Sequence, residues 1–258
     1  MKVKLETQAT LHKEGRWDID YHLPAEGIKK YGNDILKPVS DAAVVVKEKR
    51  DPTKKPDEPF KYIDISCVEV DTGQVTEPQD LLGSEAPSRA RKVIRAYDLI
   101  ISTCRPTRGA IAVIPESFHN EICSTGFSVI RPKEGINPFY LHFALRMEST
   151  LEQFRKFSTG SSYPAILDSD VEKTLIPLPD KDSQDRIAAH ILESLSSRQN
   201  AIDSANKLFT NSVNGVISSL IDENYNNYNN IFESHIYKSD DILHRIKVLE
   251  QKEETLLK

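Results

Sequence analysis

Short apolar runs separated by turn-forming residues dominate the first two thirds of the chain. The runs share a high content of Val, Ile and Leu and span residues 42–47, 62–70, 93–94, 99–103, 111–114 and 127–130. Such runs, punctuated by Gly, Pro, Asp and Ser, are typical of β-strands joined by tight turns. Apolar and polar residues alternate in 62–70, which predicts a strand with one buried face that ends in a turn at 71–73.

The hydrophobic period becomes helical in two later stretches. Between Pro138 and Phe157 apolar residues recur three and four positions apart, which predicts one amphipathic helix, and residues 168–173 fit a short helical turn. From Asp182 onward the same spacing predicts one long helix with a coiled-coil-like seam and Ser183 as its N-cap. The seam positions expected to contact a partner helix are Ile187, Ile191, Leu195, Ile202, Phe209 and Leu220.

A polar stretch divides the C-terminal region. Residues 223–233 are rich in Asn and Tyr and predict a linker. Residues 234–258 predict a second amphipathic helix, with Ile242, Ile246 and Leu249 on one face. Such thin apolar stripes cannot bury themselves well, so the two helices need each other, a second copy of the chain or a partner protein.

These patterns predict an α+β fold, in which a mainly β domain with a few helices precedes a long coiled-coil-like helical region. We expect a globular domain at 1–180, the long helix at 181–222, the linker at 223–233 and the C-terminal helix at 234–258. The single Trp, Trp17, adjoins alternating apolar positions, which fits either a segment anchored on the globular domain or packing in its core, and we prefer core packing.

Composition restricts the class of protein. The 258 residues suffice for a buried core, and no apolar run approaches the ~20 residues that cross a bilayer. The first residues form no secretory signal, so we expect a cytoplasmic protein without membrane contact. The three cysteines, Cys67, Cys104 and Cys123, form no CxxC pair, and reduced structural thiols are expected rather than disulfides or a zinc site.

The charge distribution is uneven. The net charge of −5 argues against a protein that merely coats nucleic acid. Between residues 84 and 109, however, basic residues outnumber the two acids, Glu85 and Asp98. The basic residues are Arg89, Arg91, Lys92, Arg95, Arg105 and Arg108. A local DNA-contacting face and a solvated basic loop both fit this pattern on charge alone.

No catalytic arrangement emerges from the motifs. Residues 137–140, Asn-Pro-Phe-Tyr, lack the second Pro of the amino-methyltransferase loop, and they fit a helix start because Pro suits the first turn. Asp64 and Glu69 lie an odd number of positions apart on the expected strand, so they would point to opposite faces and form a weak metal site with Lys61. The histidines form no triad with Ser or Cys. We therefore predict a chain without catalytic residues, metal or cofactor of its own.

The order of the motifs carries a resemblance. A basic loop at 86–91 precedes Tyr-Asp-Leu-Ile-Ile-Ser-Thr-Cys-Arg-Pro at 97–106, Ser-Thr-Gly-Phe at 124–127 and Gly-Ser-Ser-Tyr-Pro at 160–164. The segment Ile-Pro-Leu-Pro-Asp-Lys-Asp-Ser-Gln-Asp-Arg-Ile at 176–187 then runs straight into the long helix. Together they resemble one target-recognition domain and the following helical region of the specificity (S) subunit of type I restriction–modification systems, from about residue 61 to about residue 220.

This resemblance implies a division of labour. The domain would read one half of a bipartite double-stranded DNA site, and the helix would set the spacing and dock a methyltransferase (M) subunit. That partner would bind S-adenosylmethionine and methylate adenine, and a restriction (R) subunit would be a further partner. Ordinary S subunits carry two recognition domains, whereas this chain has room for one. The resemblance therefore implies a half-size protein that dimerises through its helices and reads a palindromic split site.

The candidate DNA contacts follow from side-chain chemistry. Arginine and lysine bind phosphates or guanine, and hydroxyl groups bind the DNA backbone or base edges. The basic candidates are Arg89, Arg91, Lys92, Arg105 and Arg108, and the hydroxyl-bearing candidates are Thr107, Ser161, Ser162 and Tyr163. The sequence does not separate base readers from phosphate contacts, and residues 159–164 equally fit a tight turn fixed by Pro164.

Two other classes of function remain open at this stage. One is a non-catalytic β-rich adaptor whose coiled-coil tail mediates protein–protein assembly without DNA reading, which suits the net acidity and the paired amphipathic helices. The other is a nucleic-acid-modifying enzyme whose site is dispersed along the sequence.

Overall fold

The computed structural model describes residues 5–160 and 162–221. The chain divides into two compact units, Met1–Leu192 and Glu193–Lys258. Ser161, the linker expected at 223–233 and the helix expected at 234–258 lie outside the described residues, and with them Ile242, Ile246 and Leu249.

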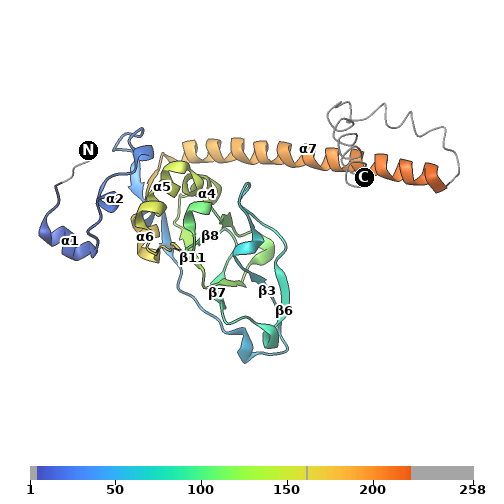
Figure 1. The fold of residues 1–258 in the computed structure, drawn as a ribbon, viewed down its shortest axis with the longest axis horizontal. Coiled ribbons are helices and arrows are strands. Elements are labelled where there is room, and N and C mark those ends of the chain that lie inside the picture. Colours follow the sequence, from blue (N-terminus) through green and yellow to red (C-terminus); the bar gives the residue numbers. More distant parts are fainter. Residues whose placement is uncertain (1–4, 161, 222–258) are drawn as a thin grey trace, which may run out of the picture. The chain divides into compact units, whose positions relative to one another are not determined.

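Two four-stranded sheets form the centre of the first unit (Figure 1). One is antiparallel throughout, with the order β2 (Ala43–Val45), β11 (Phe127–Pro132), β8 (Leu99–Ser102), β9 (Ile111–Val113). The other has the order β6 (Gln79–Leu82), β3 (Pro59–Ile63), β10 (Glu121–Ser124), β7 (Ala90–Ile94), and in it only β10 and β3 are parallel. Two small antiparallel pairs complete the strands, β1 (Leu36–Pro38) with β12 (Leu175–Pro177) and β4 (Val68–Glu69) with β5 (Gln74–Val75).

Helices cover one face of the antiparallel sheet. Figure 1 shows α4 (Pro138–Arg146) and α5 (Glu148–Phe157) beside β8 and β11. The other helices of the described chain are α1 (Gln8–Glu14), α2 (Ile19–His22), α3 (Val39–Ala42), α6 (Asp168–Lys173) and α7 (Lys181–Ile221). One 3₁₀ turn, η1 (Glu26–Ile28), lies between α2 and β1. Five others connect strands: η2 (Pro52–Lys54), η3 (Ile65–Cys67), η4 (Gly83–Glu85), η5 (Pro106–Arg108) and η6 (Glu116–Phe118).

Strand β8 lies between two hydrophobic cores. Leu99 and Ile101 face the helices and pack with Leu141 and Phe154, whereas Ile100 faces the second sheet and packs with Ile63. Successive side chains of a strand point to opposite faces, so burial of both faces requires the unbroken apolar run seen in the sequence. The predicted strands at 42–47, 99–103, 111–114 and 127–130 are confirmed, as is the α+β fold class.

The single strand predicted over 62–70 is wrong. The chain leaves β3 at Ile63, makes a 3₁₀ turn and re-enters a strand only at Val68. The carboxylate of Asp64 causes the break, because its Oδ1 accepts hydrogen bonds from the Ser66 amide at 2.8 Å and the Ser66 hydroxyl at 2.6 Å. A side chain that bonds its own backbone in this way competes with the strand ladder.

The helix predicted between Pro138 and Phe157 is two helices. Met147 has an extended conformation, with φ −62° and ψ 145°, and separates α4 from α5. The Thr150 hydroxyl donates to the Ala144 carbonyl at 2.7 Å and so satisfies a group that the break would leave free. Asn137 caps α4 by accepting from the amides of Phe139 and Tyr140, which confirms a helix start at Pro138.

Two further expectations are corrected. Trp17 is 66% exposed and does not pack in the core. Residues near Trp17 in the sequence attach the N-terminal segment to α5 instead. Arg16 donates to the Phe157 carbonyl at 3.0 Å, and the Tyr21 ring packs edge-on against the Phe157 ring. Ser183 is not the N-cap of the long helix. Asp180 is the capping residue, because its carboxylate accepts from both the amide and the hydroxyl of Ser183 at 2.9 Å, and these bonds lower its pKa.

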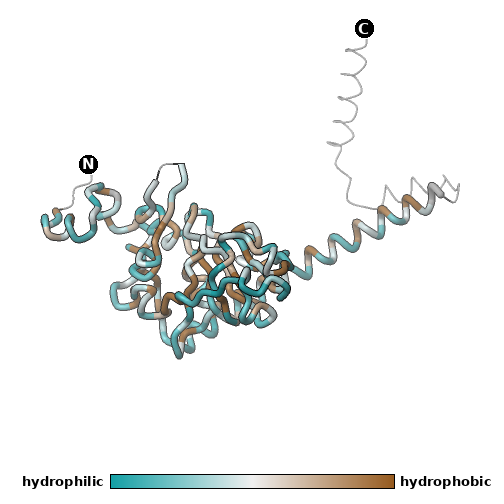
Figure 2. Tube along the Cα trace, turned by 90° about the horizontal axis from the view of Figure 1, so that it is seen from below, coloured by the Kyte–Doolittle hydropathy of each residue, from teal (hydrophilic) through white to brown (hydrophobic). Residues whose placement is uncertain are grey.

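The second unit begins within α7. Figure 2 shows that hydrophobic residues recur along this helix between hydrophilic ones. Beyond Glu193 five of the larger apolar side chains are exposed, namely Ile202, Leu208, Phe209, Val213 and Ile217. None of the described helices combines the length and the apolar content of a membrane span.

Candidate nucleic-acid interface

Four loops of the first unit are joined to one another by backbone hydrogen bonds. They are residues 86–89, 103–109, 124–126 and 159–165, and we call them the four loops. The Thr125 amide donates to the Arg89 carbonyl at 2.9 Å, and the Thr103 amide and hydroxyl both donate to the Gly126 carbonyl at 2.9 Å. The amide of Arg105 donates to the carbonyl of Pro164 at 2.7 Å. Motifs spread over some eighty positions of the sequence thus form one contiguous surface.

The loop 103–109 contains an unusual backbone conformation. Arg105 has φ +49°, in the left-handed region that non-glycine residues rarely adopt, and Pro106 then starts η5. Gly109, with φ +73°, ends the turn in the same region. The Ser102 hydroxyl donates to the Cys104 carbonyl at 2.8 Å and helps to fix the entry to the loop.

The loop 159–165 is a small closed hairpin. Thr159 and Ala165 exchange two backbone hydrogen bonds of 2.9 Å, and Gly160 has φ +91°, which a side chain would strain. The predicted turn is thus present, and it is attached to the loop 103–109. Ser162 and Tyr163 are exposed, and the Arg105 guanidinium lies 5.0 Å from the centre of the Tyr163 ring.

The basic candidates differ in what they already bind. Arg91 and Lys92 lie on strand β7 rather than in the loop expected from the sequence. The Lys92 ammonium donates to the Phe127 carbonyl at 2.5 Å. The Arg91 guanidinium donates to the Ala90 and Pro87 carbonyls, at 2.8 and 3.2 Å, and lies 3.4 Å from the Asp51 carboxylate.

The remaining candidates lie in the loops themselves. Arg89 and Arg108 are exposed, and among the described residues no hydrogen bond or ion pair engages their guanidinium groups. Thr107 is also exposed, but it lines a groove beside α5 together with both acidic and basic residues, such as Glu148 and Arg155. The structure therefore brings Arg89, Arg105, Arg108, Ser162 and Tyr163 onto the four loops and places Thr107 at their margin.

The residues that hold this surface together lie in motifs noted in the sequence, at 124–127 and 176–187, but their structural role was not predicted. The turn 124–126 connects two of the loops through backbone groups, and such bonds leave no mark on side-chain patterns. The buried Gln184 side chain is a second case. Its Oε1 accepts from the Asn137 amide at 3.0 Å, and its Nε2 donates to the Pro179 carbonyl at 2.8 Å, so it fixes the first turn of α7 on the start of α4.

Other places that could carry chemistry are occupied by structural interactions. Lys61 pairs with Asp80 at 2.6 Å, Asp64 caps its turn, and Glu69 accepts from the Thr72 hydroxyl. Burial raises the pKa of the Cys123 thiol to about 12, so this cysteine is not a nucleophile. Across residues 5–160 and 162–221 no cluster of three or more His, Cys, Asp or Glu could hold a metal ion.

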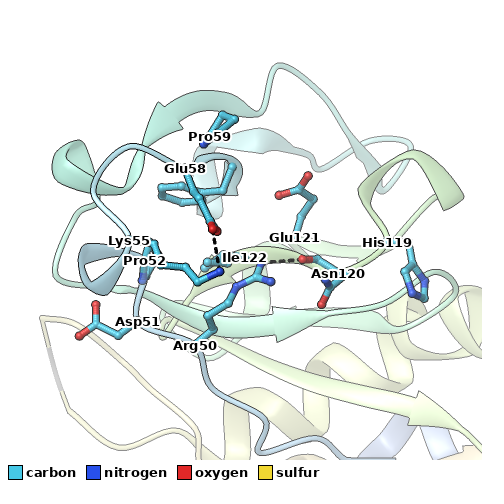
Figure 3. A pocket seen from close by; sticks show the side chains of 11 residues that line it. Arg50, Asp51, Pro52, Lys55, Glu58, Pro59, His119, Asn120, Glu121 and Ile122 are labelled. Atoms are coloured by element: carbon cyan, nitrogen blue, oxygen red, sulfur yellow. Dashed lines mark hydrogen bonds and ion pairs between the residues drawn. The ribbon is translucent and has the colours of Figure 1, made fainter.

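A cavity of about 230 Å³ lies at the opposite end of β10 from the loop 124–126 (Figure 3). Its charged groups are paired with their neighbours. Arg50 donates to the Asn120 carbonyl at 2.6 Å, and Lys55 contacts Glu58 at 2.7 Å. This pairing leaves no free acid–base couple in the cavity.

Comparison with known proteins decides the family. A family model described as the type I restriction modification DNA specificity domain matches residues 46–209. The chain belongs to this specificity-domain family. The resemblance read from the motif order is thus confirmed, and so is the non-catalytic assignment at the level of the family, in which methyltransferase activity resides in a separate subunit.

Individual members of the specificity family align with parts of this chain. The HindI specificity subunit of Haemophilus influenzae is 30% identical over 106 residues, which are 40% of this chain and 23% of that protein. The HsdS subunit of Thermoanaerobacter tengcongensis is 38% identical with a TM-score of 0.60, over 68% of this chain and 46% of that one. A structure concerned with complex assembly and conformational transition of the type I R-M system is 37% identical with a TM-score of 0.58, over 73% and 48%. The chain thus spans less than half the length of each relative.

Proposed function

We propose that this chain reads one half of a bipartite DNA site for a type I methyltransferase, using the four loops as its DNA-contacting surface. The proposal rests on one observation: backbone hydrogen bonds join these loops. Arg89, Arg105 and Arg108 therefore lie on the same surface as the exposed residues Ser162 and Tyr163. Arginine and hydroxyl side chains are the groups that bind phosphates and base edges. Membership of the specificity-domain family supports a role in DNA sequence recognition.

The helix α7 serves assembly in this proposal. Phe209 is 57% exposed, and Ile202, Val213 and Ile217 are exposed along the same helix. Apolar residues at such spacing are stable in water only when another helix covers them. We assign this face to a second copy of the chain, because one recognition lobe reads one half-site and a two-fold dimer would read both. A methyltransferase subunit, which would hold S-adenosylmethionine, and a restriction subunit complete the proposed assembly.

Mapping of methylated bases in host DNA tests the proposal. Cells that carry the gene are compared with a deletion strain, and with the deletion strain complemented by the chain or by an Arg89→Ala plus Arg108→Ala variant. The proposal expects methyladenine in a split motif that disappears on deletion, returns with the wild-type chain and returns weakly with the variant.

Two outcomes would contradict the proposal. An unchanged methylation pattern after deletion would remove the DNA-reading role and favour the adaptor. Full restoration by the variant would place the DNA contacts away from these loops. Methyl transfer by the isolated chain would instead reveal an enzyme with a dispersed site.

A further inference from the structure

One basic side chain of the four loops is oriented by an aromatic ring. Arg105 and Tyr163 come from different loops, and the guanidinium carbon lies 5.0 Å from the ring centre. Tyr163 is 70% exposed, so this pair lies at the outer surface of the lobe. Resting on the function proposed above, we propose that Arg105 reads a guanine in the major groove and that Tyr163 is the positioning residue that orients its guanidinium.

The backbone fixes both members of the pair. The Arg105 amide donates to the Pro164 carbonyl at 2.7 Å, next to Tyr163, and the Ile166 amide donates to the Thr103 carbonyl at 3.0 Å. An isolated bridge also pairs Cys104 with Ala165. Three successive contacts therefore join the two loops up to the base of the Arg105–Tyr163 pair, and the backbone of Arg105 is positioned before any DNA is bound.

The chemistry of the pair suits a base better than a phosphate. The contact with the Tyr163 ring restricts where the Arg105 guanidinium lies and leaves its N–H donors available to a base. Guanine presents two acceptors, N7 and O6, side by side in the major groove, and a planar pair of donors matches them. A phosphate needs positive charge more than a fixed plane, and unstacked Arg89 and Arg108 supply that charge in the same loops.

The hydrogen-bond inventory separates Arg105 from its basic neighbours. Within the described part of the chain no hydrogen bond or ion pair uses the guanidinium N–H groups of Arg105, whereas the guanidinium of Arg91 already donates to two carbonyls. The left-handed backbone of Arg105, at φ +49°, is a conformation that glycine adopts without strain. Glycine would form the same turn without strain, so the presence of arginine here indicates that its side chain has a function.

Base selection by the full-length chain, in complex with a type I methyltransferase subunit, tests this assignment. Wild type, Arg105→Lys, Arg105→Gly, Tyr163→Ala and Tyr163→Phe each select duplexes from a library with a randomised core. Arg108→Lys is the matched control, since it makes the same exchange in the same loop without a stacked ring. Guanines of the selected site are then replaced one at a time by 7-deazaguanine, which lacks the N7 acceptor.

The expected result is a change at one base pair. In wild type, 7-deazaguanine at one position weakens binding about tenfold, as expected for a bidentate contact. Arg105→Gly loses the preference for guanine at that position and becomes insensitive to the replacement, and Arg105→Lys weakens both, while the other positions stay selected. Tyr163→Ala weakens the same preference, and Tyr163→Phe and Arg108→Lys retain it. Melting temperatures confirm that the variants are folded.

The failures are distinguishable. If wild type selects no sequence, the proposed DNA-reading function fails and this assignment fails with it. If wild type selects a site but both Arg105 variants select the same site with the same 7-deazaguanine sensitivity, only the Arg105–Tyr163 assignment is overturned. Weaker binding by the Arg105 variants with unchanged base preferences at every position would also overturn the assignment. That result would indicate that Arg105 contacts a phosphate or only stabilises the loops.

Discussion

The β-rich lobe and the distal part of α7 use similar apolar residues with opposite results. In β8, Ile100 and Ile101 are fully buried because a sheet covers one side and helices cover the other. In α7, Ile202 and Phe209 are exposed among the described residues. The lobe therefore buries its central apolar side chains within itself, whereas the described part of this helix leaves its own exposed, and we propose that a second copy of the chain covers them. This contrast matches a division between a rigid reading surface and an assembly element.

The largest expected effect comes from making the exposed helix face polar. Ile202→Asp combined with Phe209→Asp places four buried charges in the proposed dimer, so we expect the dimer dissociation constant to rise at least about 1,000-fold, about 4 kcal/mol. Sedimentation equilibrium measures this change. The control, Ser197→Asp with Asn211→Asp, adds the same charge at exposed polar positions on the opposite face of the helix and should leave the constant nearly unchanged. Equal behaviour of the two double variants would contradict the assembly role of this face.

The lobe should respond to pH through a buried histidine. Burial lowers the pKa of His142 from 6.5 to about 4, and its Nε2 lies 3.0 Å from the Ile111 carbonyl. The unfolded chain therefore binds the proton more readily than the folded one, and stability falls as the pH drops from about 6.5 towards 4, by up to about 3 kcal/mol.

Urea unfolding over this pH range measures the effect of His142. His142→Gln should flatten the acid limb of the stability curve, whereas His119→Gln, at an exposed position, should leave its slope unchanged. Identical slopes for wild type and His142→Gln would show that another group causes the loss.

The junction between lobe and helix depends on a buried amide. Gln184→Ala removes hydrogen bonds to the Asn137 amide and the Pro179 carbonyl, and we expect a loss of about 2 kcal/mol because the Gln184 side chain is buried and two half-buried partners lose their bonds. Gln199→Ala is the control, since its amide contacts only the exposed Asp203. Chemical denaturation measures the free energy of unfolding of both variants. An equal loss in Gln184→Ala and Gln199→Ala would contradict this assignment.

The smallest effect distinguishes loop arginines from strand arginines. Arg108→Ala should weaken DNA binding up to about tenfold and reduce the slope of log affinity against log salt by about one, as expected for a lost phosphate contact. Arg91→Ala should change this slope less, because its guanidinium already donates to two carbonyls. DNA affinity is measured at several salt concentrations for both variants. A larger change of slope in Arg91→Ala than in Arg108→Ala would contradict this prediction.

The sequence predicted elements whose cause is local. The unbroken apolar run of β8 and the Asn-Pro start of α4 reflect burial and capping by neighbouring residues, and both were found. It missed features decided by competition or by distant contacts. Asp64 breaks an alternating strand by bonding its own backbone, and Asp180 rather than Ser183 caps α7. The joining of the loops around Arg105 depends on backbone bonds between distant segments, which a pattern of residue types does not encode.

Hydrogen–deuterium exchange of the full-length chain, with and without a duplex selected from a random library, tests the reading surface most directly. The account predicts slower exchange on DNA binding in residues 86–89, 103–109, 124–126 and 159–165, all at one end of β10. Unchanged exchange in these loops, with protection at residues 50–59 and 119–122 around the opposite cavity, would contradict it.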